Sequence, residues 1–298
     1  MSLRLQANDP ASVKRFLPCF VVSLLVVLPS FSLNAFAEQN QSSTDYSQWG
    51  GAYTQEDSDQ FWQALRLNYF GERKITEQQD IIKLKAPSRA ENDAIVPVSL
   101  ELTPASDINK ISQVYLFVDV NPSPVAGIFT INPERSLDEI DTRVRVNGYT
   151  YIRAVAETTG GELYLDKKWV KSRGAGCSAP PTIDQAEHQQ KLGKMRFRSS
   201  QLADNSELVQ LMISHPNNTG MQTDQLTTMI IPQHYINEVE VWLGEEQLLH
   251  ADTTFTLSEN PSFRFKLDQE ESAQLTAIVK DTEGNVFIHK QDSKTPAQ

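Results

Sequence analysis

Cysteine is almost absent from this chain of 298 residues, which contains only Cys19 and Cys177. Two cysteines are too few for a disulfide framework or a cysteine-based zinc site. The histidines are also few, and no two have a close metal-binding spacing: His188, His215, His234, His250 and His289. The dinucleotide, P-loop and nucleophile-elbow motifs are missing from the sequence. We therefore expect no metal, no cofactor and no independent catalysis, so the protein is not predicted to be an enzyme.

Excess positive charge is missing as well. The chain carries 27 Lys and Arg against 38 Asp and Glu, a net charge of −11. A protein that binds nucleic acid or an anionic membrane surface would need a local basic patch to overcome this charge. The one small basic cluster consists of Lys167, Lys168, Lys171 and Arg173. We expect no nucleic-acid partner.

Residues 1–37 have the pattern of a secretory signal peptide. Basic residues precede an apolar stretch at 16–33, and Ala35 and Ala37 provide the small residues of a cleavage site. A retained membrane anchor is the alternative, but the apolar stretch is barely long enough to span a bilayer. We predict export to the periplasm, a cleaved signal peptide and no membrane association after cleavage. Cys177 then remains as the only thiol and has no internal disulfide partner.

The next segment, residues 38–57, is polar and is predicted to be a flexible leader. A helix should then begin at a cap formed by Ser58 or Asp59, because apolar residues follow at helical spacing. Gly71 should end this helix, since glycine is the usual residue after a helical C-terminus.

Short runs with strand character fill two regions, 58–172 and 191–298. The runs in the first region are 81–84, 95–102, 114–118, 127–131, 142–147, 151–157 and 162–165. The runs in the second region are 194–198, 208–213, 239–243, 254–257, 262–267, 274–279 and 286–289. Residues 173–190 are rich in Gly, Ala, Ser and Pro and then polar, which is typical of an interdomain linker. The predicted fold is all-β, with two immunoglobulin-like β-sandwich domains in tandem and a short N-terminal helix before the first.

Cys177 lies in this linker, within the sequence KSRGAGCSAPP at 171–181. Glycine permits backbone angles that are closed to other residues, so the small residues around the thiol predict a flexible arm. The arm consists of Gly174, Ala175, Gly176 and Ser178. Lys171 and Arg173 would support the thiolate and attract an anion, because positive charge favours an ionised cysteine. The alternative is an incidental cysteine in an ordinary linker.

Several segments resemble the two subunits of the SoxYZ sulfur-oxidation carrier. VDVNPSP at 118–124, TRVRVN at 142–147 and VAET at 155–158 resemble SoxY. ISHPNNTG at 213–220 and NPSFRF at 260–265 resemble SoxZ. Over roughly residues 58–290, the chain resembles the fused SoxYZ-like carriers that are associated with quinoprotein dehydrogenases.

This resemblance implies that Cys177 is a covalent attachment point for a sulfur-containing or thiol-reactive intermediate. It also implies periplasmic partners such as a quinoprotein dehydrogenase, a c-type cytochrome or sulfur-oxidation enzymes. The chain departs from the SoxY pattern because the cysteine arm is internal and is followed by a second domain.

Two other functions remain open. The chain could be a non-covalent docking module for a periplasmic dehydrogenase or cytochrome, in which the loop between 213 and 239 would matter most. It could also be a scaffold that dimerises through a Cys177 to Cys177 disulfide.

Overall fold

The computed structural model describes residues 52–135, 137–182, 185–203, 206–267 and 273–292. The predicted signal peptide, 1–37, and most of the predicted leader, 38–57, lie outside these residues. The described residues belong to one structural unit, Tyr46–Gln298. No helix among them is long and apolar enough to cross a membrane.

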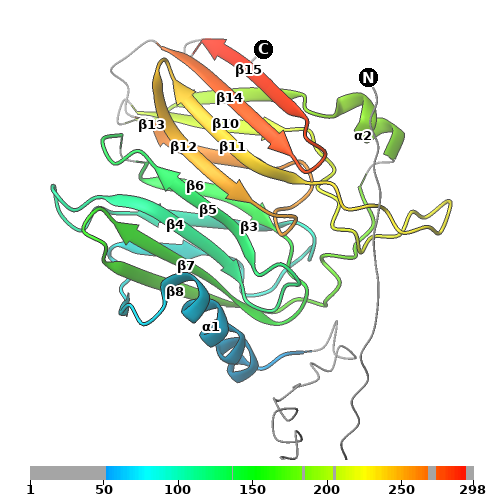
Figure 1. Cartoon of the computed structure of the whole chain (residues 1–298), viewed down its shortest axis with the longest axis horizontal. Helices are drawn as coiled ribbons and strands as arrows, with labels where there is room; N and C mark the ends of the chain where they lie inside the picture. The colour runs from blue at the N-terminus through cyan, green and yellow to red at the C-terminus, as the bar shows by residue number, and fades with distance from the viewer. Residues whose placement is uncertain (1–51, 136, 183–184, 204–205, 268–272, 293–298) are drawn as a thin grey trace, which may run out of the picture. The chain divides into compact units, whose positions relative to one another are not determined.

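The fold is all-β, as predicted, and consists of two sandwiches (Figure 1). The elements of the first are α1 (Gln55–Phe70), β1 (Ile75–Glu77), β2 (Ile82–Lys85), β3 (Val96–Leu102), β4 (Ile111–Val118), β5 (Val125–Ile131), β6 (Glu139–Val144), β7 (Thr150–Thr158) and β8 (Leu163–Val170). Those of the second are α2 (Gln185–Lys191), β9 (Met195–Gln201), β10 (Glu207–Ile213), β11 (Ile236–Leu243), β12 (Glu246–Thr253), β13 (Ser262–Leu267), β14 (Gln274–Asp281) and β15 (Val286–Asp292).

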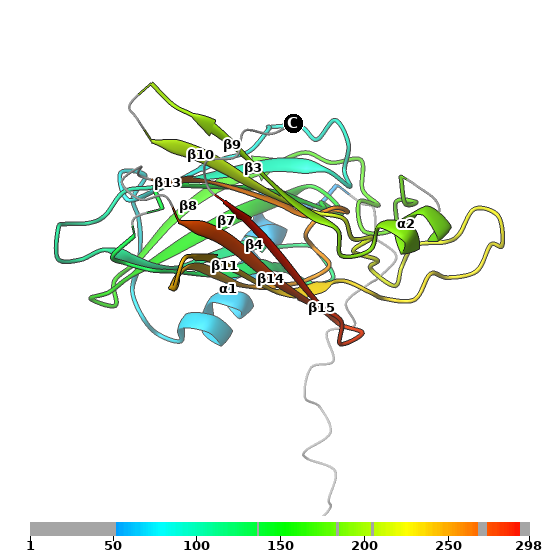
Figure 2. The same cartoon turned by 90° about the horizontal axis from the view of Figure 1, so that it is seen from above.

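The two sandwiches are joined edge to edge and share both of their layers. One sheet has nine strands in the order β1-β8-β7-β4-β5-β12-β11-β14-β15, and the other has six in the order β2-β3-β6-β13-β10-β9. Figure 2 shows these layers with α1 outside the nine-stranded sheet. Two antiparallel pairings cross the seam between the sandwiches, with His250 opposite Thr130 and Arg264 opposite Asp141. The seam thereby covers four strand edges that would otherwise present unpaired backbone groups.

Alternating side chains explain why these segments form strands. In β10, every second residue from Glu207 to Ile213 is buried, and β13 places Phe263 and Phe265 in the core. Alternation of this kind puts one face of a strand against the core and the other toward solvent. The buried faces of both sandwiches form one continuous hydrophobic core that crosses the seam.

The predicted N-terminal helix exists and ends at Gly71, but it begins earlier than predicted. Its cap is Thr54, whose hydroxyl accepts from the N–H of Asp57 while the Asp57 carboxylate accepts from the N–H of Thr54. This capping box satisfies N–H groups that the first helical turn leaves free. Ser58, a predicted cap, instead lies on the buried face and donates a 2.7 Å hydrogen bond to Asp119.

The strand expected at 254–257 is wrong, and the strand in this region is β12. Residues 254–257 form a turn, in which the N–H of Leu257 donates to the carbonyl of Thr254. Leu257 is fully buried and forms only an isolated antiparallel bridge with Val144, so its apolar character reflects core packing more than a continuous strand. The linker prediction for 173–190 also missed α2, a short polar helix without an apolar stripe.

Candidate functional site

The chain folds back onto the first sandwich directly after β8. The hydroxyl of Ser172 donates to the carbonyl of Val146 and accepts from the N–H of Gly174. The N–H of Arg173 donates to the carboxylate of Asp93. These bonds attach the beginning of the cysteine segment, residues 172–179, to the first domain.

Cys177 is completely buried and is held from both domains. Its backbone N–H donates to Oδ1 of Asn147 at 3.3 Å, and its carbonyl accepts from the Thr219 hydroxyl at 2.5 Å. Two residues later, the carbonyl of Ala179 accepts from the side-chain amide of Gln222 at 2.9 Å. Asn147 follows β6, whereas Thr219 and Gln222 lie between β10 and β11, so the thiol sits where the two domains meet.

Gly176 permits close backbone packing and does not serve as a flexible point in the chain. A Cβ atom at this position would overlap the carbonyl oxygens of Asp93 and Val146, so only glycine lets the backbone approach so closely. Gly174 and Ala175 have φ values of 91° and 70°. A turn begins at Ala175, and the N–H of Ser178 closes it by donating to the carbonyl of Ala175.

The flexible arm expected from Gly174, Ala175, Gly176 and Ser178 is therefore a packed turn in this structure. Ala175 and Ser178 are exposed, while Gly174 and Gly176 are buried with the thiol. Glycine can give the chain flexibility or permit close backbone contact, and the sequence does not distinguish these two uses; Gly176 has the second in this structure.

The expected support of the thiolate by Lys171 and Arg173 also needs correction. Both side chains are exposed, and the cation next to the thiol is Arg145. Arg145 is 1% exposed and donates to the carbonyls of Gly176 and Asn217. Within the described part of the chain, the Nε atom of Arg145 has no hydrogen-bond partner, and the carboxylate that acts on its charge is Glu259.

Burial controls the ionisation of both groups. It raises the pKa of Cys177 to about 12, against the attraction of Arg145, which lowers it. Burial also lowers the pKa of Arg145, while Cys177 and Glu259 act in the opposite direction. The buried cysteine is therefore a neutral thiol at physiological pH, beside the buried positive charge of Arg145.

A second buried cluster lies next to this segment and joins His215, His234 and Asp281. Nε2 of His234 lies 2.8 Å from Oδ2 of Asp281, and Nε2 of His215 lies 3.5 Å from the same oxygen. Burial would raise the pKa of Asp281, but hydrogen bonds from Asn285 and His234 lower it to about 2. An ionised carboxylate only accepts hydrogen bonds, so both rings donate to it.

These three residues have the composition of a metal site, but the position of the ring proton on His215 indicates a hydrogen-bonding role instead. Nδ1 of His215 accepts from the N–H of Asn217 at 3.1 Å, which places the ring proton on Nε2. A metal-binding histidine normally donates from its second nitrogen. The cluster thus acts as a hydrogen-bonded anchor for the loop that carries Asn217 and Thr219.

Two sequence families cover the two sandwiches. The family described as "Sulfur oxidation protein SoxY" matches residues 66–177, and the family described as "Sulphur oxidation protein SoxZ" matches residues 195–292. The chain is a SoxY domain fused to a SoxZ domain. It is therefore a sulfur-oxidation carrier-type protein. Cys177 is the last residue of the SoxY match.

Solved structures resemble only parts of the chain. A superoxide reductase (neelaredoxin) from Ignicoccus hospitalis is 15% identical, with a TM-score of 0.27 over 31% of this chain and 80% of its own. A β-glycosidase from Bacteroides vulgatus is 11% identical, with a TM-score of 0.23 over 71% of this chain and 24% of its own. No curated protein matches the sequence.

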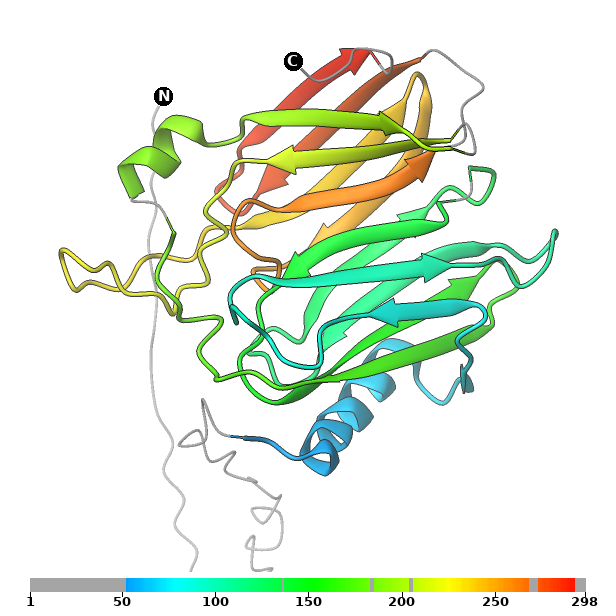
Figure 3. The same cartoon turned by 180° about the vertical axis from the view of Figure 1, so that it is seen from behind.

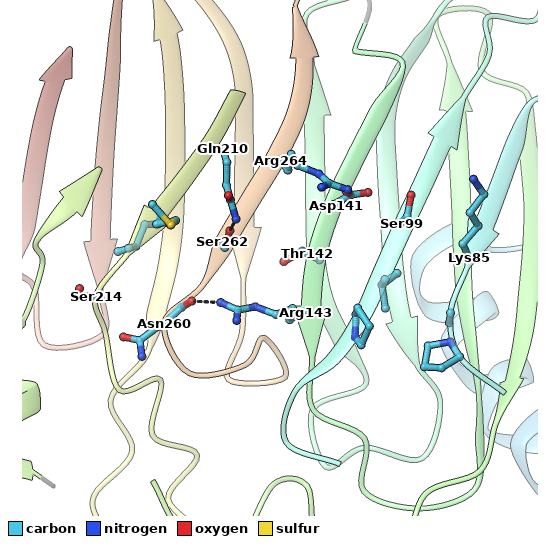
Figure 4. Close-up of a pocket in the computed structure, with 16 residues that line it drawn as sticks. Lys85, Ser99, Asp141, Thr142, Arg143, Gln210, Ser214, Asn260, Ser262 and Arg264 are labelled. Carbon is cyan, nitrogen blue, oxygen red and sulfur yellow. Dashed lines mark hydrogen bonds and ion pairs between the residues drawn. The ribbon is translucent and has the colours of Figure 1, made fainter. Parts of the chain in front are cut away.

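A groove of about 770 Å³ lies elsewhere, on the six-stranded sheet across the seam between the SoxY and SoxZ domains. Figure 4 shows Arg143 beside Asn260, and its guanidinium donates to the Asn260 carbonyl at 2.7 Å. Gln210 donates to Ser262 at 2.8 Å within the SoxZ half. Cys177 does not line this groove.

Sequence reasoning missed Arg145, Asn147, Thr219 and the histidine cluster as parts of the cysteine site. Arg145 alternates with valines and resembles a solvent-facing strand residue, but it lies just beyond β6. The available signal was the resemblance itself, since TRVRVN contains Arg145 and Asn147 and ISHPNNTG contains His215 and Thr219.

Proposed function

We propose that this protein is a periplasmic carrier that holds an anionic sulfur-containing group covalently on Cys177 and presents it to partner enzymes. The observation that supports this most directly is the pairing of Cys177 with Arg145. The buried guanidinium of Arg145 has carbonyl acceptors but an unpartnered Nε atom in the described residues, and a buried charge is stabilised further by an anionic partner. A negative group attached to the thiol would supply that partner.

Loading can be written as an oxidative coupling. The Cys177 thiol and a sulfur anion R–S⁻, whose R group carries a further negative charge, form an S–S bond, one proton leaves the thiol, two electrons pass to a partner redox protein, and the attached group stays anionic through R. A c-type cytochrome is a suitable acceptor class, and a quinoprotein dehydrogenase is the system in which we place the carrier. The chain itself then provides the attachment point and the counter-ion, while the partners provide the chemistry.

The thiol must leave its buried position to be loaded. A neutral thiol with a raised pKa and no exposed surface is a poor nucleophile, because the thiolate is the reactive form. The contacts of Asn147, Thr219 and Gln222 with the cysteine segment are individually weak, and a few such bonds can open locally without global unfolding. The buried state protects the thiol between encounters.

The test is the intact mass of the protein purified from its native periplasm, before and after reduction. We expect a small mass increase that reductant removes and that Cys177→Ser lacks. Arg145→Met should lower the loaded fraction, whereas Arg143→Met, which changes a groove arginine two residues away, should not. A bare thiol in the native protein would contradict the proposal. A reductant-sensitive dimer without a small adduct would instead favour the disulfide scaffold.

A further inference from the structure

The segment at 220–233 is an ordered hairpin that extends away from the SoxZ sandwich (Figures 1 and 3). A bridge pairs Thr223 with Ile230, and the N–H of Asp224 donates to the carbonyl of Met229. Its backbone is therefore closed on itself as a two-stranded projection. We name residues 220–233 the SoxZ hairpin.

The tip of the SoxZ hairpin is apolar and exposed. Leu226, Met229 and Ile230 are 92%, 67% and 61% exposed. Asp224 is the only charged residue of the hairpin, and its carboxylate accepts from the N–H groups of Leu226 and Thr227. A contiguous exposed apolar group of this kind marks an interaction site, and its partner must offer an apolar surface rather than a charged one.

The base of the same hairpin holds the cysteine segment. Gln222 lies at the start of the hairpin and donates to the carbonyl of Ala179. Gln233 lies at its end and donates to the carbonyl of Thr219, whose hydroxyl donates to the carbonyl of Cys177. A protein bound to the tip would therefore be held by the same segment whose base covers the attachment cysteine.

We infer that the SoxZ hairpin is the docking element for the enzyme that loads Cys177, and that Leu226, Met229 and Ile230 enter an apolar pocket of that enzyme. This inference rests on the proposed carrier function. The occupant is a loading enzyme rather than a second copy, because the hairpin is continuous with the contacts that cover the thiol and carries no charged pairs of its own.

The experiment compares two triple variants purified from the native host without reductant. One is Leu226→Asp/Met229→Asp/Ile230→Asp, and the other is Ile108→Asp/Val286→Asp/Ile288→Asp, which changes three similarly exposed apolar residues away from the hairpin. We expect the fraction of protein that carries an adduct on Cys177 to fall roughly tenfold in the hairpin variant, because central interface contacts contribute most of the binding energy. The control should stay loaded. Reaction of Cys177 with iodoacetamide in the purified reduced proteins should differ little between them.

Thermal unfolding of both variants shows whether the hairpin variant is folded, and the single variant Leu226→Asp serves if the triple variant is not. Normal loading of a folded hairpin variant, with a loaded wild type, overturns this inference and leaves the carrier function standing. A wild type with a bare thiol overturns both. Sedimentation that shows a wild-type dimer and a monomeric hairpin variant overturns the inference in favour of a second copy as the occupant.

Discussion

The Thr219 hydroxyl lies 2.5 Å from the carbonyl oxygen of Cys177, although 42 positions separate the two residues in the chain. The contact crosses from the SoxZ domain to the last residue of the SoxY match. Because the two domains are fused, the hydroxyl that holds the Cys177 backbone belongs to the same polypeptide as Cys177.

Thr219→Val should remove this hydrogen bond, and the one that the hydroxyl accepts from the N–H of Met221, with little change in side-chain shape. A net hydrogen bond contributes about 0.5–1.5 kcal/mol, so its loss should raise the population of the open segment about two- to tenfold. We expect the rate of Cys177 alkylation to rise by that factor at constant pH. The matched control is Thr130→Val, an exposed threonine on β5, which should leave the rate unchanged. Equal rates for both variants would mean that Thr219 does not limit opening.

Gly176→Ala tests packing against flexibility. The added methyl group would overlap the carbonyl oxygens of Asp93 and Val146, so the segment cannot return to its buried position. We expect fast alkylation of Cys177 and a loss of about 1–3 kcal/mol in the free energy of unfolding, as for overpacking. Both are measurable by labelling kinetics and urea denaturation.

Ala175→Gly is the neighbouring control for that variant. Ala175 has a φ of 70°, which glycine adopts without steric cost, so this change adds flexibility and removes strain at once. If packing controls the thiol, alkylation should not become faster. Acceleration in Ala175→Gly as large as in Gly176→Ala would favour the flexible-arm interpretation.

Much of the fold could be predicted because period-two alternation is a local property. The strand at Ser262–Leu267 has the predicted bounds, and its alternation is visible in the printed sequence. The seam could not be predicted, because pairing of β5 with β12 and of β6 with β13 depends on contacts more than 100 positions apart. Contacts between separate parts of the chain also hid the site, because Arg145 lies 31 positions from Gly176 and Thr219 lies 42 positions from Cys177.

Acid stability should depend on two buried groups with opposite effects. Burial and His234 lower the pKa of His215 from 6.5 to about 4, so the unfolded chain binds a proton first as the pH falls, and stability is lost between these values. Burial raises the pKa of Asp119 from 3.8 to about 6, although Arg153 and Ser58 oppose the shift. The folded state then binds its proton first, and stability is gained as the pH falls from 6 toward 3.8.

Asp119→Asn should therefore make the protein more sensitive to acid. As the pH falls, the variant still loses the stability that depends on His215, but it lacks the stability that wild type gains from Asp119. That gain is at most about 1.4 kcal/mol per pH unit in the free energy of unfolding. Urea denaturation at about pH 6 and about pH 4.5 should show a larger decrease for Asp119→Asn than for wild type. Asp107→Asn, at an exposed position, should behave as wild type. An equal decrease in all three proteins would mean that Asp119 is ionised in both states.

Cutting the chain at residues 183–184 should test whether the seam makes the two sandwiches interdependent. Each half alone exposes two long strand edges, β5 and β6 or β12 and β13, together with part of the shared core. Unpaired edges of this kind promote aggregation, so we expect neither half to be a soluble monomer when expressed alone.

Expressed together, the halves should form a one-to-one complex on size-exclusion chromatography, because the strand pairings across the seam do not need the covalent connection. Cys177 should remain slow to alkylate in that complex, since Thr219 is supplied by the other half. Two separately folded, monomeric halves would show instead that the seam is a contact between independent domains, and the hydrogen bond from Thr219 to Cys177 would then depend on the covalent fusion.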